Sequence, residues 1–140
     1  MRVGAIDVGT NSIHLLVAEI AADGRIEVVE KAREQVELGR GGLGTDRLAD
    51  DAYARGIDAL AGFKVACESL QVEHITAAAT SAVRESANGP DFCRDVHART
   101  GIHLRIIPGS EEARLIYLGA RPHLDFSRGR VLLFDVGGGS

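Results

Sequence analysis

Apolar positions follow two rhythms along the chain, and each rhythm predicts a kind of element. Residues 2–8 and 12–20 are apolar runs joined by a short polar turn, and residues 25–30 continue with strand-like alternation. Three strands with such tight connections favour an antiparallel meander. Over about residues 45–70 the apolar positions instead recur every three or four residues, which predicts a long helix. The face that this helix buries consists of Leu48, Ala52, Gly56, Leu60, Phe63, Cys67 and Leu70.

The second half of the chain alternates between strand and helix. Strands are expected at residues 74–80, 104–107 and 130–136, and helices at residues 90–101 and 111–120. The order is βββαβαβα followed by one more strand, and such alternation favours parallel additions to the first meander. The predicted fold is therefore α/β: a ribonuclease H-like lobe with a mixed five-stranded sheet and helices packed on it.

Composition narrows the classes of protein to which this chain can belong. The chain has 140 residues, 45% of them hydrophobic, and a net charge of −4, so it is too apolar for disorder and lacks the basic excess of a nucleic-acid binder. No apolar stretch approaches the ~20 residues of a membrane span, and no signal-peptide pattern opens the chain. Cys67 and Cys93 are expected to be reduced thiols. We therefore expect a cytoplasmic protein.

An internal repeat is the most informative feature of the sequence. Residues 3–12 align with residues 131–140, and five of the ten positions are identical. In both copies an apolar strand ends in an Asp followed by a glycine-containing turn, whose backbone N–H groups can surround a phosphate. One such turn is commonly an ordinary hairpin, and a terminal Gly-Gly-Gly-Ser is also typical of a linker. Two matched copies instead indicate a lobe over residues 1–122, with residues 123–140 as linker and first strand of a related second lobe.

Four motifs, at residues 7–14, 80–88, 109–114 and 135–140, occur in order along the chain. Together they resemble the exopolyphosphatase / guanosine pentaphosphate phosphohydrolase family of the actin-like ATPase and sugar kinase superfamily. The resemblance covers the whole chain. It implies Mg²⁺-dependent release of the terminal phosphate of inorganic polyphosphate, or of the 5′ γ-phosphate of guanosine pentaphosphate. It leaves open which substrate is preferred and whether the protein forms a homodimer.

The candidate catalytic residues are two glutamates and one arginine. Glu111 and Glu112 open a predicted helix, where acidic residues often only complement the helix dipole. A carboxylate that faces a cleft can instead orient and deprotonate a water for in-line attack on phosphorus. The resemblance points to Glu112 as this base, with Glu111 as second choice. Arg84 is either a solvated surface residue or, as the resemblance implies, a bidentate phosphate clamp.

The resemblance also implies two phosphate-binding turns and a metal site. Asp135 resembles a metal ligand of the family, whereas Asp7 either contacts a metal-bound water or holds the hairpin by accepting N–H bonds. Residues 39–44 are rich in glycine but lack the P-loop signature, so we expect a loop at the rim of the cleft. His14 is expected to be structural. The phosphate-binding residues implied are Gly9, Thr10, Asn11, Ser12, Gly137, Gly138, Gly139 and Ser140.

Two other functions remain open at the level of sequence. One is a regulatory module that binds polyphosphate or guanosine pentaphosphate without hydrolysing it, and the other is half of an ATP-dependent kinase or ATPase. The second phosphate motif stops at Ser140, before the Thr-Glu with which the family pattern continues. Because phosphoryl transfer depends on substrate positioning, we expect the 140-residue chain alone to be inactive or weak. With a net charge of −4, affinity for a polyanion must come from individually placed groups.

Overall fold

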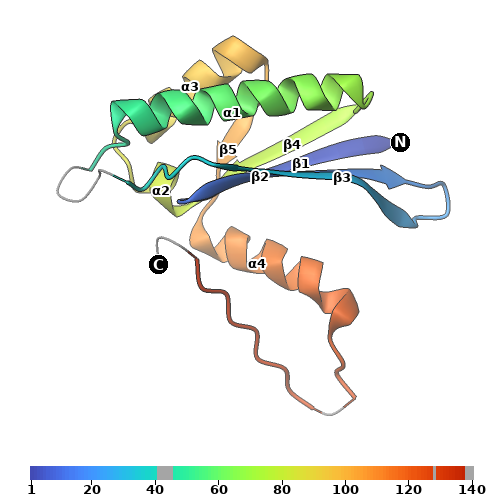
Figure 1. Cartoon of the computed structure of the whole chain (residues 1–140). Helices are drawn as coiled ribbons and strands as arrows, with labels where there is room; N and C mark the ends of the chain where they lie inside the picture. Colours follow the sequence, from blue (N-terminus) through green and yellow to red (C-terminus); the bar gives the residue numbers. More distant parts are fainter. Residues whose placement is uncertain (41–45, 128, 138–140) are drawn as a thin grey trace.

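A computed structural model describes residues 1–40, 46–127 and 129–137, and it has one mixed sheet at its centre (Figure 1). The first three strands form the predicted antiparallel meander, and the last two join it in parallel, in the order β3-β2-β1-β4-β5. This arrangement confirms the ribonuclease H-like α/β fold. The strands are β1 (Arg2–Val8), β2 (Ser12–Ile20), β3 (Ile26–Gln35), β4 (His74–Ala79) and β5 (Leu104–Ile106).

Helices lie on both sides of the sheet, but they pack on it unequally. Helices α1 and α3 cover one face, whereas α4 lies on the opposite side (Figure 1). No residue of α4 is buried, so that face of the sheet is only loosely covered. The helices are α1 (Asp50–Ser69), α2 (Ser81–Arg84), α3 (Gly89–Thr100) and α4 (Gly109–Ala120), which a 3-10 turn (Arg121–His123) follows.

The hydrophobic core lies between the sheet and the α1–α3 layer. Strand alternation turns every second side chain of β1 and β2 toward the helices, and Val8, Ile13 and Val17 are fully buried there. The predicted buried stripe of α1 is confirmed from Ala52 to Cys67. A Cβ on Gly56 would lie 2.9 Å from the ring of Phe92, so this glycine lets α1 approach α3 closely.

The start of α1 differs from the prediction. The helix predicted over about residues 45–70 begins only at Asp50, and Thr45 lies outside the described residues. The buried side chain of Asn88 explains the later start. Its Oδ1 accepts a hydrogen bond from the Leu48 N–H (2.8 Å), and its Nδ2 donates one to the Leu48 carbonyl (3.1 Å). These bonds fix Leu48 outside the helix.

The prediction of a strand over residues 130–136 is wrong for this chain. The segment runs extended beyond α4 but pairs with no strand of the described residues (Figure 1). Its apolar side chains are open to solvent, with Phe134 79% and Val136 85% exposed. An apolar run supplies strand propensity, but a strand also needs a neighbour for its backbone hydrogen bonds. In the part of the chain that is described, no helix is long and apolar enough to cross a membrane.

Candidate active site

The turn between β1 and β2 is the first part of the site, and backbone hydrogen bonds fix its shape. The Gly9 N–H donates to the Ser12 carbonyl (3.1 Å), which closes the turn. The Asn11 carbonyl accepts hydrogen bonds from Val36 (3.0 Å) and Glu37 (2.8 Å), in the segment that follows β3. Hydrogen bonds within the turn and from the segment after β3 therefore fix the conformation of the turn without a ligand.

The end of β4 brings a second segment against this turn. Because β4 runs parallel to β1, both strands end at the same edge of the sheet. The Thr80 N–H donates to the Val8 carbonyl (3.1 Å), and the hydroxyl oxygens of Thr10 and Ser81 lie 2.9 Å apart. The four-residue helix α2, which the sequence pattern did not predict, starts here and carries Arg84.

The residues after α2 are structural. A Cβ on Gly89 would collide with the carbonyl oxygen of Val83, so only glycine lets the chain turn from α2 into α3 at this point. Asn88 precedes α3, but its side chain accepts no hydrogen bond from the first turn of that helix, since its amide is bonded to Leu48.

Arg84 and Glu112 form an ion pair within the site. One guanidinium nitrogen, Nη1, donates to Glu112 Oε2 (3.0 Å) and to the Ile107 carbonyl (2.9 Å). The side chains are only 28% and 29% exposed, respectively. Glu112 lies in the first turn of α4, and its backbone N–H donates a hydrogen bond to the Pro108 carbonyl. The ion pair therefore connects the segment after β4, which carries Arg84, with the segment after β5, which carries Glu112.

The two adjacent glutamates of α4 face different surroundings. Glu111 accepts two hydrogen bonds from Arg114, at 2.7 and 2.9 Å. These bonds lower the pKa of the Glu111 carboxyl below its ordinary value. Glu111 does not line the cavity, whereas Glu112 does. The geometry thus separates the two candidates and favours Glu112.

A cavity of about 620 Å³ brings most of the predicted site residues together. Gly138, Gly139 and Ser140 lie outside the described residues. The predicted residues that line the cavity are Asp7, Gly9, Thr10, Asn11, Ser12, Arg84, Glu112, Asp135 and Gly137. Residues 131–137 contribute to its wall although they form no strand, so both copies of the internal repeat meet at one hollow.

Two carboxylates of this cavity, Asp7 and Asp135, are the candidate metal ligands. Partial burial raises the pKa of the Asp7 carboxyl, His14 opposes that change, and the negative charges of Glu112 and Asp135 raise the pKa further. Within the described residues, no hydrogen bond runs from the hairpin to the Asp7 carboxylate, which favours the metal or water alternative over the structural one. Across the same residues no three metal-binding side chains converge. Mg²⁺ commonly takes only one or two carboxylates and completes its shell with water and substrate phosphate, so the two aspartates fit it.

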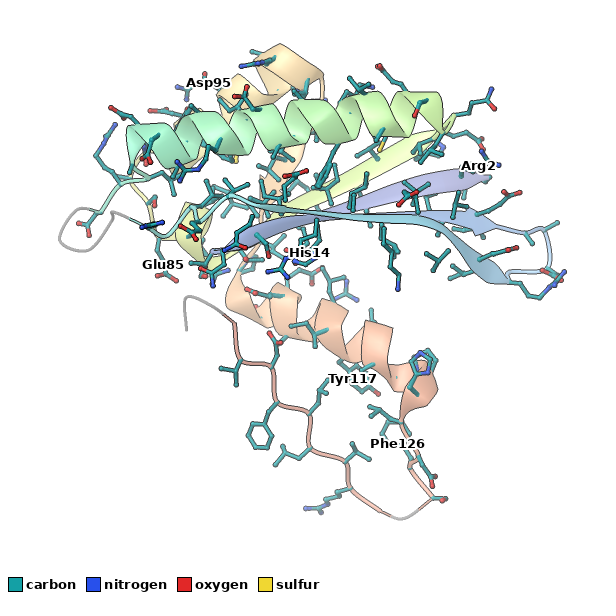
Figure 2. The ribbon with its side chains drawn as sticks, viewed as in Figure 1. Arg2, His14, Glu85, Asp95, Tyr117 and Phe126 are labelled. Carbon is teal, nitrogen blue, oxygen red and sulfur yellow. The ribbon has the colours of Figure 1, made fainter. Side chains whose placement is uncertain are left out.

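Sequence reasoning missed several residues that line the cavity. His14 was expected to be structural, but its ring lines the cavity, with Nε2 2.8 Å from Ser12 Oγ. Figure 2 shows His14 on the side of the sheet where α4 lies. The signal was available in the alternation of β2: Ile13 and Leu15 are buried toward the helices, so His14 faces the other way. Arg33, Thr80 and Ser81 also line the cavity without having been predicted.

Fold and cavity together define a class of protein: a ribonuclease H-like lobe with a polar hollow where β1 and β4 end. A comparison with models of known protein families then identifies the family. The model of the Ppx/GppA phosphatase family matches residues 16–140, and the chain belongs to this family.

Relatives agree with this assignment in sequence and in structure. The chain is 31% identical over 140 residues to exopolyphosphatase 1 of Mycobacterium leprae, which covers all of the chain and 41% of that relative. The crystal structure of an exopolyphosphatase from Cytophaga hutchinsonii superposes with a TM-score of 0.83 at 33% identity, over 87% of this chain and 39% of the other. The Ppx/GppA family member of Aquifex aeolicus gives 0.81 at 31% identity, over 86% and 39%. The chain thus spans about two-fifths of the length of these relatives.

Proposed function

We propose that the full-length protein is a phosphohydrolase that releases the terminal phosphate of inorganic polyphosphate, with the 5′ γ-phosphate of guanosine pentaphosphate as a second substrate. The observation that carries this proposal is the single cavity in which Arg84, Glu112, Asp7 and Asp135 meet the β1–β2 turn. The names of the relatives support the first substrate, since those from M. leprae and C. hutchinsonii are called exopolyphosphatases.

Substrate binding falls to the turn and to Arg84. Backbone N–H groups of a tight turn are fixed dipoles, and they bind phosphate oxygens without reorganising. Arg84 already bonds Ile107 and Glu112 through Nη1, so its guanidinium plane is oriented before substrate arrives. The remaining N–H groups of that fork are suited to two oxygens of one phosphate. Charge that develops on these oxygens during transfer is thereby stabilised.

Glu112 is the proposed general base. Its Oε2 accepts the hydrogen bond from Arg84, which leaves Oε1 for a water molecule. A carboxylate held in this way can orient the water for in-line attack and take its proton as the bond to phosphorus forms. The phosphoanhydride bond then breaks, and the shortened polyphosphate chain leaves with the bridging oxygen.

Mg²⁺ is the proposed cofactor, held by Asp135 and Asp7. A bound magnesium ion would neutralise phosphate charge and orient the phosphate oxygens. Asp7 is the last residue but one of β1, and the exposed segment 131–137 brings Asp135 to the same cavity. The two copies of the internal repeat would thus supply one metal ligand each.

Phosphate release by the full-length protein tests this proposal. We expect release from long-chain polyphosphate in the presence of Mg²⁺, and loss of that release when EDTA removes the metal. Guanosine pentaphosphate and ATP are assayed in parallel under the same conditions. Tight binding of polyphosphate without any release would favour a regulatory module instead. Transfer from ATP to an acceptor, with polyphosphate untouched, would favour a kinase.

A further inference from the structure

A row of side chains crosses the open face of the sheet from one edge to the other. Asp7 on β1 is paired with His14 on β2, and His14 with Arg33 on β3. In the other direction Asp7 is paired with Ala78 on β4, and Ala78 with Arg105 on β5. Directly opposed residues of neighbouring strands point to the same face. The proposed metal ligand therefore sits in the middle of a row with an arginine at each end.

The edge strand β3 carries its basic and acidic side chains on opposite faces of the sheet. Lys31 and Arg33 pair with Leu16 and His14, which face the open side. Glu30 and Glu34 pair with Val17 and Ile13, and both of these partners are fully buried on the helix side. Strand alternation therefore gives the open face the basic residues of β3 and the opposite face its acidic ones.

The basic side chains of β3 share a hollow with the carboxylates of Asp7, Glu112 and Asp135, but in the described part of the chain they form no ion pair. The ion pairs found among residues 1–40, 46–127 and 129–137 include neither Lys31 nor Arg33. Both residues line a second hollow of about 740 Å³ between the sheet and α4. This hollow adjoins the first, because Asp7, Glu112 and Arg33 line both. An anion in the first cavity can therefore extend toward Lys31 and Arg33, past the three carboxylates that line both hollows.

We propose that Arg33 and Lys31 form a subsite for the phosphates that follow the terminal one in an inorganic polyphosphate chain. Neighbouring strands are ~4.8 Å apart, so Arg33 lies roughly 10 Å from Asp7, two strands away. A long polyphosphate whose terminal phosphate lies at Arg84 and Glu112 can extend past Arg33, which lines both hollows, to Lys31, which lines only the second, whereas a short chain makes fewer of these contacts. The subsite rests on the proposed function, and it makes affinity depend on chain length.

Binding to the full-length protein tests the subsite separately from catalysis. In a Glu112→Gln background, in which turnover is blocked, Arg33→Ala is expected to raise the Kd for long-chain polyphosphate on the order of tenfold, the loss of one charge-assisted contact. Lys31→Ala should show the clearer preference for long chains, with a Kd for tripolyphosphate within about twofold of the background value, because Lys31 lines only the second hollow whereas Arg33 also lines the first. Arg33→Lys keeps the charge but loses the planar guanidinium fork, so its Kd for long-chain polyphosphate should lie between those of Arg33 and Arg33→Ala.

Arg25→Ala is the matched control. It removes the same charge from the same hairpin, but Arg25 lies beyond the far end of β3 and pairs with Asp23 at 2.7 Å. Long-chain affinity that is unchanged in Arg33→Ala, or that falls equally in Arg25→Ala, would overturn the subsite. An equal loss of tripolyphosphate affinity in Lys31→Ala would also overturn it. Absence of phosphate release by the wild-type protein would instead reject the proposed function, whatever the binding constants.

Discussion

The two copies of the internal repeat share a sequence pattern, but the first forms a strand whereas residues 131–137 of the second do not. In the first copy the apolar residues form β1, where Val8 is fully buried between two strands and the helix layer. In the second copy the equivalent residue, Val136, is 85% exposed on a segment that pairs with no strand among the described residues. Both copies nevertheless bring an aspartate to the same cavity. The apolar pattern gives a segment the propensity to form a strand, but the strand forms only where a neighbouring strand can share its backbone hydrogen bonds.

Matched substitutions at the equivalent valines give the largest expected effect. Val8→Asp places a charge in the core and is expected to lower the free energy of unfolding of this chain by on the order of 3–5 kcal/mol. Val136→Asp changes an exposed side chain and is expected to alter it by less than about 0.5 kcal/mol. Urea denaturation followed by circular dichroism measures both values. Similar losses from the two variants would contradict the difference between the copies.

A double-mutant cycle on Thr10 and Ser81 addresses the turn of the first copy. Their hydroxyls lie 2.9 Å apart and join the β1–β2 turn to α2. Thr10→Val and Ser81→Ala are expected to show a coupling energy of roughly 1 kcal/mol, the usual contribution of one hydrogen bond. Ser69→Ala paired with Thr10→Val is the control, because Ser69 bonds Ala66 at the far end of α1. Additive effects for Thr10 and Ser81 would mean that the turn is not held through this contact.

A smaller effect is expected from the ionisation of Asp7. Its pKa is raised in the folded state, chiefly by partial burial, so the folded chain holds this proton to a higher pH than the unfolded chain does. The free energy of unfolding should therefore fall as pH rises between the unfolded and folded pKa values of this group. Asp7→Asn removes that contribution, so in EDTA it should be more stable than wild type at neutral pH, with the advantage lost in acid. Unfolding midpoints measured at several pH values test this, and a neutral-pH stability below that of wild type would contradict it.

Much of the fold was predictable from sequence because it depends on local periodicity. The meander, the buried stripe of α1 and the end of α3 at Gly101, whose φ of 72° is left-handed, all follow from short-range patterns. The late start of α1 was not predictable, since it depends on hydrogen bonds between Leu48 and Asn88, forty residues apart. The same holds for the strand expected over residues 130–136, whose formation needs a neighbour that no local pattern reveals.

The candidate site could be predicted in its residue types but not in its geometry. Arg84 and Glu112 were each identified separately, whereas their 3.0 Å contact depends on how β4 and β5 align. Arg33 was missed because nothing in its own segment marks it. Only the strand register shows that it shares a row with Asp7.

The contrast between the adjacent glutamates tests the central claim most directly. Glu112 lines the cavity and pairs with Arg84, whereas Glu111 pairs with Arg114 outside it. In the full-length protein, Glu112→Gln is expected to lower kcat for phosphate release from long-chain polyphosphate by roughly 10²–10⁴-fold, the range of general-base catalysis. Glu111→Gln should leave kcat within about threefold of wild type, since the Glu111 carboxylate is held by Arg114 outside the cavity and a first-turn charge contributes little. A Glu112→Gln enzyme with wild-type kcat, or an equal loss in both variants, would contradict the assignment of Glu112 as the base.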